Sequence, residues 1–162
     1  MIKKITILLF SFWFAFGCEK DDICDEEMTT PRIVIEFFNV NNPSVPRNVT
    51  NLIIKSPDVE EPYGSPVNAN TVSIPLKTFA DQTILELTNQ GGSSLANTDI
   101  ITINYTRDLI YISRACGFKT HFNLVPQQGF VLSQDTNNWI QSINIINNKI
   151  DSENEAHIKI FF

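Results

Sequence analysis

Short runs of β-branched and aromatic residues recur along this chain of 162 residues, and they constrain its fold more than any other feature. Between residues 99 and 105, Ile101, Ile103 and Tyr105 alternate with polar residues, which is the two-residue period of a half-buried strand. No stretch shows a sustained 3.6-residue period with helix caps. The pattern therefore predicts an all-β protein.

The runs that predict strands lie between polar turn signals, at residues 32–38, 51–55, 71–77, 83–88, 99–105, 109–112, 120–125, 129–132, 141–146 and 156–162. The tripeptide Thr106-Arg107-Asp108 suits a hairpin turn between two of them. Pro75 cannot donate to a strand ladder, so its strand is expected at a sheet edge. We expect an immunoglobulin-like β-sandwich of seven to nine short antiparallel strands over residues 32–162.

The first seventeen residues have the pattern of an export signal. Lys3 and Lys4 precede a twelve-residue, largely apolar run from Ile5 to Phe16. This run is too short to cross a bilayer as a helix, which needs about twenty residues. Residues 1–17 are therefore predicted to be removed from the mature protein.

The end of this signal, Ala15-Phe16-Gly17-Cys18, resembles the lipobox of bacterial lipoproteins, in which the cysteine is acylated. The resemblance implies that lipid chains such as palmitate on Cys18 attach the mature chain to a membrane. The alternative is a soluble secreted protein in which Cys18 forms a disulfide.

Residues 18–31 form an acidic tether, and Lys20, Asp21 and Asp22 follow the cysteine closely. These three residues are similar to the export signal that sends lipoproteins to the outer face of the outer membrane in Bacteroidota. We expect surface exposure on that membrane, with the periplasmic leaflet or a plain solvated linker as alternatives.

The net charge of the chain is −6, and removing residues 1–17, which contain two lysines and no acidic residue, changes it to −8. Nucleic acid is an unsuitable partner, because its binding depends on Lys and Arg neutralising phosphates. The membrane is expected to be a partner through the lipid on Cys18 alone.

If Cys18 is acylated, two cysteines remain, and Cys24 and Cys116 are expected to pair, because two thiols outside the cytoplasm are usually oxidised. Such a disulfide would join the tether to the domain. Three alternatives stay open: Cys116 as a nucleophile with His121 as its base, a zinc site built from the cysteines and a histidine, and free thiols.

The sequence contains no nucleophile elbow and no phosphate-binding glycine loop, and we predict no catalytic residues, no cofactor and no metal. The acidic loops 58–61 and 151–155 are weak calcium candidates. Trp139 follows a polar loop that contains Asn137 and Asn138, a composition suited to stacking on sugars or anchoring a partner. The alternative interpretation places Trp139 in the core.

Two segments resemble an uncharacterised family of Bacteroidota outer-membrane lipoproteins. They are Cys18–Glu26 with the strand Thr29–Phe37, and Ser113–Lys119 around the last cysteine. The resemblance implies an envelope address and a β domain, and it implies no activity. We therefore expect a non-enzymatic binding module whose partner is an envelope protein or glycan. The alternatives are a structural envelope lipoprotein and a surface hydrolase that uses loop carboxylates or Cys116.

Overall fold

The computed structural model describes Cys24 and residues 29–162, in which every regular element is a β-strand. The predicted all-β class is confirmed. The chain divides into two compact units. One contains residues 30–110 and 120–162, and the described residues of the other are 111–119, Cys24 and Thr29.

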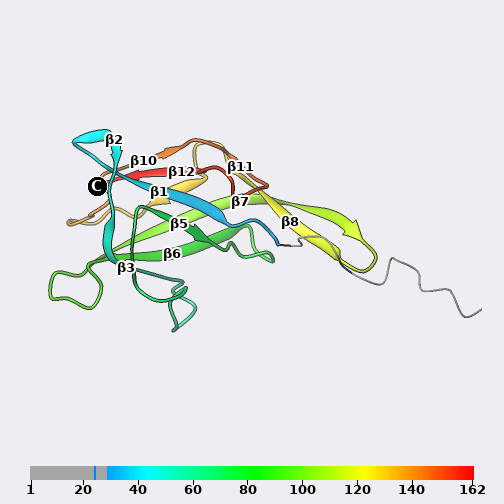
Figure 1. The fold of residues 1–162 in the computed structure, drawn as a ribbon, viewed down its shortest axis with the longest axis horizontal. Helices are drawn as coiled ribbons and strands as arrows, with labels where there is room; N and C mark the ends of the chain where they lie inside the picture. Colours follow the sequence, from blue (N-terminus) through cyan, green and yellow to red (C-terminus); the bar gives the residue numbers. More distant parts are fainter. Residues whose placement is uncertain (1–23, 25–28) are drawn as a thin grey trace, which may run out of the picture. The chain divides into compact units, whose positions relative to one another are not determined.

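The described strands form two sheets (Figure 1). The first sheet has the order β10-β12-β1-β2, with β5 also paired to β1. Its members are β1 (Ile33–Asn39), β2 (Asn42–Pro46), β5 (Thr71–Ile74), β10 (Ser142–Ile145) and β12 (Ile158–Phe161). The predicted edge position of the 71–77 segment is confirmed, because β5 ends before Pro75 and its pairing within the described chain is to β1.

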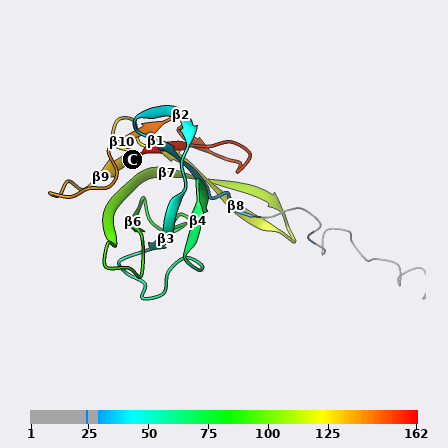
Figure 2. The same ribbon diagram turned by 60° about the vertical axis from the view of Figure 1, so that its left-hand side comes forward.

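The second sheet has the order β11-β8-β7-β6-β3-β4, with β9 paired to β7. Its members are β3 (Val49–Lys55), β4 (Val67–Ala69), β6 (Gln82–Asn89), β7 (Asn97–Ser113), β8 (Gly117–Leu124), β9 (Phe130–Leu132) and β11 (Lys149–Ile150). Figure 2 shows β1, β2 and β10 on the opposite side of a layered arrangement from β3 and β6. The two sheets thus form a sandwich-like fold.

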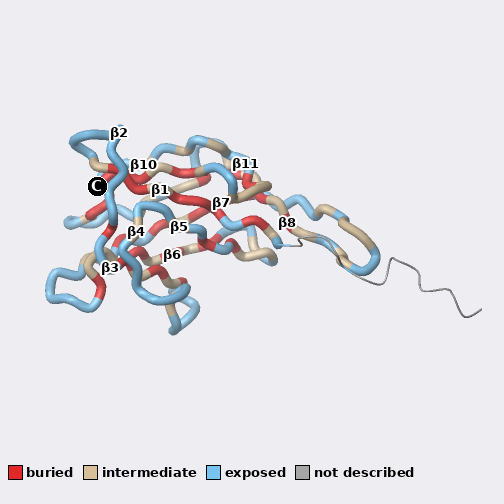
Figure 3. Tube along the Cα trace, in the orientation of Figure 1, coloured by how far each residue is buried: buried red, intermediate tan, exposed pale blue. Residues whose placement is uncertain are grey.

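The core lies between the sheets, where alternate positions of the facing strands are buried (Figure 3). On β6 and β7 the period is regular: Leu85, Leu87, Ile101 and Ile103 are fully buried and their chain neighbours are not. On the central strand β1 both faces are largely covered. The two-residue period read from the sequence therefore gives the correct inward face of these strands.

The strand count and the direction of one pair differ from the sequence prediction. Twelve strands are present in the described chain instead of seven to nine, since β2, β4 and β11 are short ribbons of two to five residues without a strong apolar pattern. The pair β1–β12 is parallel, with Ile35 opposite Ile158 and Phe37 opposite Ile160. The strands at the two ends of the domain meet here, so no hairpin sets their direction.

The predicted hairpin turn at Thr106-Arg107-Asp108 is wrong. These residues lie inside β7, which runs without a break to Ser113, and the connection to β8 follows at residues 114–116. The three polar side chains are exposed positions of a strand. Asp108 accepts a hydrogen bond from Nδ2 of Asn123 at 2.7 Å, so it serves a strand-to-strand contact. Three consecutive polar residues are compatible both with a turn and with an exposed part of a strand, so composition alone did not distinguish the two.

Candidate functional site

The residues predicted for lipidation and export lie outside the part of the chain that the structure describes. They are Cys18, Lys20, Asp21 and Asp22, and the predicted signal of residues 1–17 precedes them. These assignments stay predictions.

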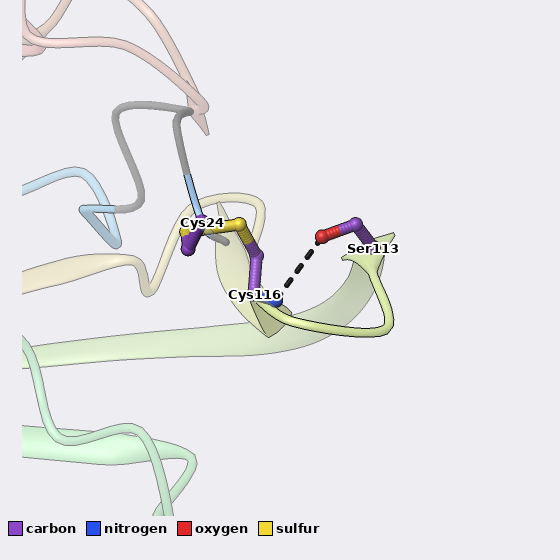
Figure 4. The surroundings of a disulfide bond; sticks show 3 residues. All are labelled: Cys24, Ser113 and Cys116. Carbon is purple, nitrogen blue, oxygen red and sulfur yellow. Dashed lines mark hydrogen bonds between the residues drawn. A yellow bond between two sulfur atoms is a disulfide. The ribbon is translucent and has the colours of Figure 1, made fainter. Parts of the chain in front are cut away.

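The disulfide predicted from the cysteine count is present. Cys24 and Cys116 are bonded, with their Cα atoms 5.1 Å apart (Figure 4). Cys116 sits in the turn after β7, where its N–H donates to Oγ of Ser113 at 3.1 Å. Gly117 follows with φ of +72°, a conformation that glycine adopts without strain. The bonded sulfur excludes Cys116 as a thiolate nucleophile or zinc ligand in this state.

Trp139 is a core residue, which confirms the interpretation that placed it in the core, and the other interpretation, an exposed stacking position, is wrong. Only 9% of Trp139 is exposed, and its Nε1–H donates to the backbone oxygen of Leu87 at 3.0 Å. The indole meets Phe162 edge-on, with ring centroids 5.3 Å apart, and lies near Phe37. A polar loop precedes it, and the ring itself fills the space between the sheets.

Asn137 and Asn138 are placed in an exposed loop, and their groups are used within the loop or by its neighbours. Asn138 accepts from the N–H of Asp135 and donates to the backbone oxygen of Ser133. The backbone oxygen of Asn137 accepts from Nδ2 of Asn97 at 2.6 Å. The loop borders a hollow of about 370 Å³ whose lining is mostly polar. Without the indole it lacks the aromatic face that sugar stacking requires.

The carboxylate of Asp99 binds the backbone at the end of this loop, and the sequence prediction missed this residue. The side chain is fully buried on β7, and its two carboxylate oxygens accept the N–H groups of Trp139 and Ile140 at 3.3 and 2.8 Å. Burial raises the pKa of Asp99, and these donors oppose the rise. Asp99 shares the inward phase of Ile101 and Ile103, which is the signal that would have found it.

A mostly apolar hollow of the larger unit lies where β7 leaves the core. Its volume is about 430 Å³, and it is lined by Thr78, Phe79, Asp81, Thr106, Arg107 and Leu109. Phe79 is 96% exposed and Leu109 is 70% exposed. Natural ligand pockets have volumes of about 300–1,000 Å³, so the hollow is large enough for a small ligand or an anchoring side chain.

Arg107 fixes one wall of this hollow. Its Nε donates to Oδ1 of Asp81 at 2.8 Å, and its Nη1 donates to the backbone oxygen of Thr78 at 2.8 Å. The residue was predicted to lie in a turn, and the strand conformation is what brings it to the 78–81 loop. The wall therefore combines a guanidinium with two exposed apolar side chains.

A buried hydroxyl network holds the 77–81 loop from the core side. The N–H of Lys77 donates to Oγ1 of Thr83, and the hydroxyl of Tyr105 donates to the backbone oxygen of Lys77 at 2.9 Å. The Tyr105 proton is thus committed, so Thr83 donates across the 2.6 Å contact between the two hydroxyls. Burial raises the pKa of Tyr105, which keeps the phenol protonated. Phe79 is exposed on a loop with fixed ends.

The acidic loops proposed for calcium carry ion pairs instead. Asp58 pairs with Lys77, Asp151 pairs with Lys149, and Glu153 forms a two-oxygen contact with Arg32. The hydrogen bonds from these cations lower the pKa of Asp151 and Glu153. Within Cys24 and residues 29–162, no group of three or more His, Cys, Asp or Glu side chains is placed to share a metal.

The smaller unit carries an exposed aromatic pair beside the disulfide turn. Tyr111 on β7 and Phe118 on β8 meet at a steep angle, with ring centroids 5.3 Å apart. They are 59% and 62% exposed. Cys116 of this turn was predicted as a functional residue from the sequence, and the two aromatic residues were not.

The fold and the cystine define an all-β sandwich protein with a disulfide-linked hairpin end. A family model described as a family of unknown function, DUF6452, matches residues 51–162, and the chain belongs to this family. No curated protein and no solved structure gives a significant match. None of the residues that the structure describes forms a helix long and apolar enough to span a membrane.

Proposed function

We propose that the mature chain is a lipid-anchored protein of the cell envelope that binds another envelope component and is not an enzyme. The observation that carries this proposal is the Cys24–Cys116 disulfide, because stable structural disulfides belong to oxidising compartments outside the cytoplasm. The export signal of residues 1–17, with Cys18 at its end, supports the same address.

The proposed anchor is an acylated Cys18, and the proposed location is the outer face of the outer membrane. Lys20, Asp21 and Asp22 support export to that face, and the resemblance of the tether to Bacteroidota lipoproteins supports the membrane. Burial of acyl chains supplies about 0.8 kcal/mol per CH₂, so the acidic chain needs no basic patch to stay attached.

The hollow beside Phe79 supports binding as the activity. Exposing large apolar side chains to water is unfavourable, and neighbouring exposed apolar groups often mark an interaction site. Phe79 and Leu109 line one hollow, and Arg107, which is ion-paired with Asp81, adds a fixed guanidinium with further N–H donors to it. These features fit a partner, an envelope protein or a glycan, that offers an apolar surface next to an acceptor group.

The address is tested by labelling cells with an alkyne fatty acid and treating whole cells with protease. We expect label on the wild-type protein and none on Cys18→Ala, together with digestion of the wild type in intact cells. An unlabelled wild-type protein would refute the lipid anchor. Protection until lysis would place the protein on the periplasmic leaflet.

The binding site is tested by a photo-crosslinking amino acid at position 79 in living cells. We expect one discrete adduct from position 79 and none from a matched probe at Ile146, which is also exposed. Replacing Leu109 with Ser should reduce the adduct. Equal labelling at both positions would favour the alternative of a structural lipoprotein without a specific partner.

A surface hydrolase is the weaker alternative. Its proposed nucleophile, Cys116, is bonded to Cys24, and the loop carboxylates Asp58, Asp151 and Glu153 are in ion pairs. Hydrolysis of envelope glycans by the purified protein that is lost with Asp151→Asn would revive it.

A further inference from the structure

The disulfide ties the hairpin tip, defined as residues 111–119, to a position very near the proposed lipid. Cys24 lies six positions after Cys18 in the sequence. A fully extended chain of this length spans at most about 20 Å. Because Cys24 is bonded to Cys116 at the tip, the tip cannot move farther than about this distance from an acylated Cys18. The covalent connections alone therefore keep it beside the bilayer.

The exposed side chains of the tip suit that environment. Tyr111 and Phe118 present an aromatic pair to solvent, and Tyr carries a hydroxyl that favours the boundary between water and hydrocarbon. The tip also contains Arg114 and Lys119 and no acidic residue, although the whole chain is acidic. Aromatic residues with flanking basic residues are typical of segments that lie in a membrane interface.

We propose that the hairpin tip rests on the bilayer that carries the lipid of Cys18, with Tyr111 and Phe118 at the boundary between headgroups and acyl chains. This inference rests on the proposed lipid anchor. The lipid supplies the affinity for the membrane, and the tip supplies a second, fixed point of contact. Tethering makes the contact intramolecular, with an effective concentration on the order of millimolar, so a weak aromatic contact suffices.

The experiment uses the lipidated protein in vesicles of phosphatidylethanolamine and phosphatidylglycerol whose acyl chains are brominated near the headgroup. A tryptophan is introduced by Phe118→Trp, and the matched control is Leu95→Trp, a position that is 70% exposed in the other unit. Trp139 is the only native tryptophan after residue 17, and it gives the same background in both variants. Mass spectrometry of the intact protein first establishes acylation.

We expect bromolipid to quench the Phe118→Trp emission several-fold more than that of Leu95→Trp. Adding Cys24→Ser and Cys116→Ser should reduce the quenching at 118 to that of the control. Equal quenching at the two positions, no quenching at 118, or quenching that survives loss of the disulfide would overturn the inference.

Two outcomes separate this inference from the proposal on which it rests. A mature chain without acyl groups would refute the lipid anchor, and the membrane contact would fall with it. An acylated chain whose tip is not quenched would refute the membrane contact alone. If a photo-crosslinker at position 118 captures a protein in cells while lipid quenching is absent, the tip is a protein-binding surface and the inference is wrong.

Discussion

The two halves of strand β7 are stabilised by different means. From Asn97 to Tyr105 every second residue is buried, and the strand pairs with both β6 and β9. From Thr106 to Ser113 no residue is buried, and the nearest covalent constraint is the disulfide of Cys116. One continuous strand thus passes from a region held by core packing to a region held by pairing with β8 and by a crosslink.

This difference suggests that the inner half of β7 has a structural role and the outer half a role in binding. The inner half fixes Asp99 and Tyr105, which position the neighbouring loops from within the core. The outer half presents Arg107, Leu109 and Tyr111 to solvent, where they are available for contacts with partners. Residues that are not needed for the core are the ones to which we assign function.

Removing the crosslink should have the largest effect. The double variant Cys24→Ser/Cys116→Ser opens a covalent loop whose ends are 92 residues apart in sequence, and the chain-entropy model gives a loss of up to about 4–5 kcal/mol in unfolding free energy. Urea unfolding measures this loss, and hydrogen exchange should show faster exchange at residues 111–119 than in the inner half. An unchanged urea midpoint would contradict a stabilising role, and the reduced wild type is the control.

Truncating one apolar side chain in each half of β7 should lower the unfolding free energy much more in the buried inner half than in the exposed outer half. Ile103→Ala in the inner half should lower the unfolding free energy by about 2–5 kcal/mol, because it leaves a cavity in the core. Leu109→Ala in the outer half should change it by less than about 0.5 kcal/mol. Both values come from urea titration of the oxidised protein. Similar losses in the two variants would mean that the halves are not stabilised differently.

Removing one carboxylate in each half tests the same contrast for polar groups. Asp99→Ala leaves two buried N–H groups without an acceptor, and we expect a loss of about 1–3 kcal/mol. Asp108→Ala removes one exposed hydrogen bond from Asn123 and should cost less than about 0.5 kcal/mol. Thermal unfolding of both variants, with Asp99→Asn as the isosteric control, decides the outcome. Equal shifts would argue against a structural role of Asp99.

Mild acid should weaken the sandwich by a smaller amount. His157 is buried, its Nδ1 accepts the N–H of Val34 at 3.0 Å, and burial lowers its pKa. The unfolded chain therefore binds the proton more readily than the folded chain. The stability from His157 is complete above the ordinary imidazole pKa of about 6.5 and is lost as the pH falls below it.

Because the lost contact is one hydrogen bond, we expect a decrease of about 1 kcal/mol between pH 7.5 and pH 5. Urea midpoints at the two pH values measure it, and His157→Gln should flatten the difference. At the hairpin tip, hydrogen exchange should change with pH only as the intrinsic exchange rate of an amide does, because the tip does not contain His157. If His157→Gln keeps the full pH dependence, another group is responsible.

Local patterns in the sequence predict much of the fold and part of the site. The alternation of Ile101, Ile103 and Tyr105 gives the inward face of β7, and the same phase would also have identified Asp99 as buried, although the prediction did not use it. The cysteine count predicted the pair Cys24–Cys116 once Cys18 was assigned to a lipid, because only two cysteines then remained. The inward face of a strand depends on residues two positions apart in the sequence, and the disulfide pair depends on the number of cysteines.

Contacts between distant segments could not be read in this way. Residues 106–108 have the composition of a turn, yet pairing with β8 keeps them in a strand. Trp139 follows a polar loop, yet Phe37 and Phe162, from opposite ends of the domain, surround its ring. Phe79 is exposed because no other segment of the described chain packs over its side chain, and this depends on the tertiary arrangement around its loop.

The sequence by itself determined the all-β class, the inward phase of the long strands and the disulfide pair. The tertiary structure decided the parallel pairing of β1 with β12, the burial of Trp139 and the hollow beside Phe79. The physical reason is that a two-residue period states which side of a strand is apolar. It does not state which strand lies opposite, and burial depends on that partner.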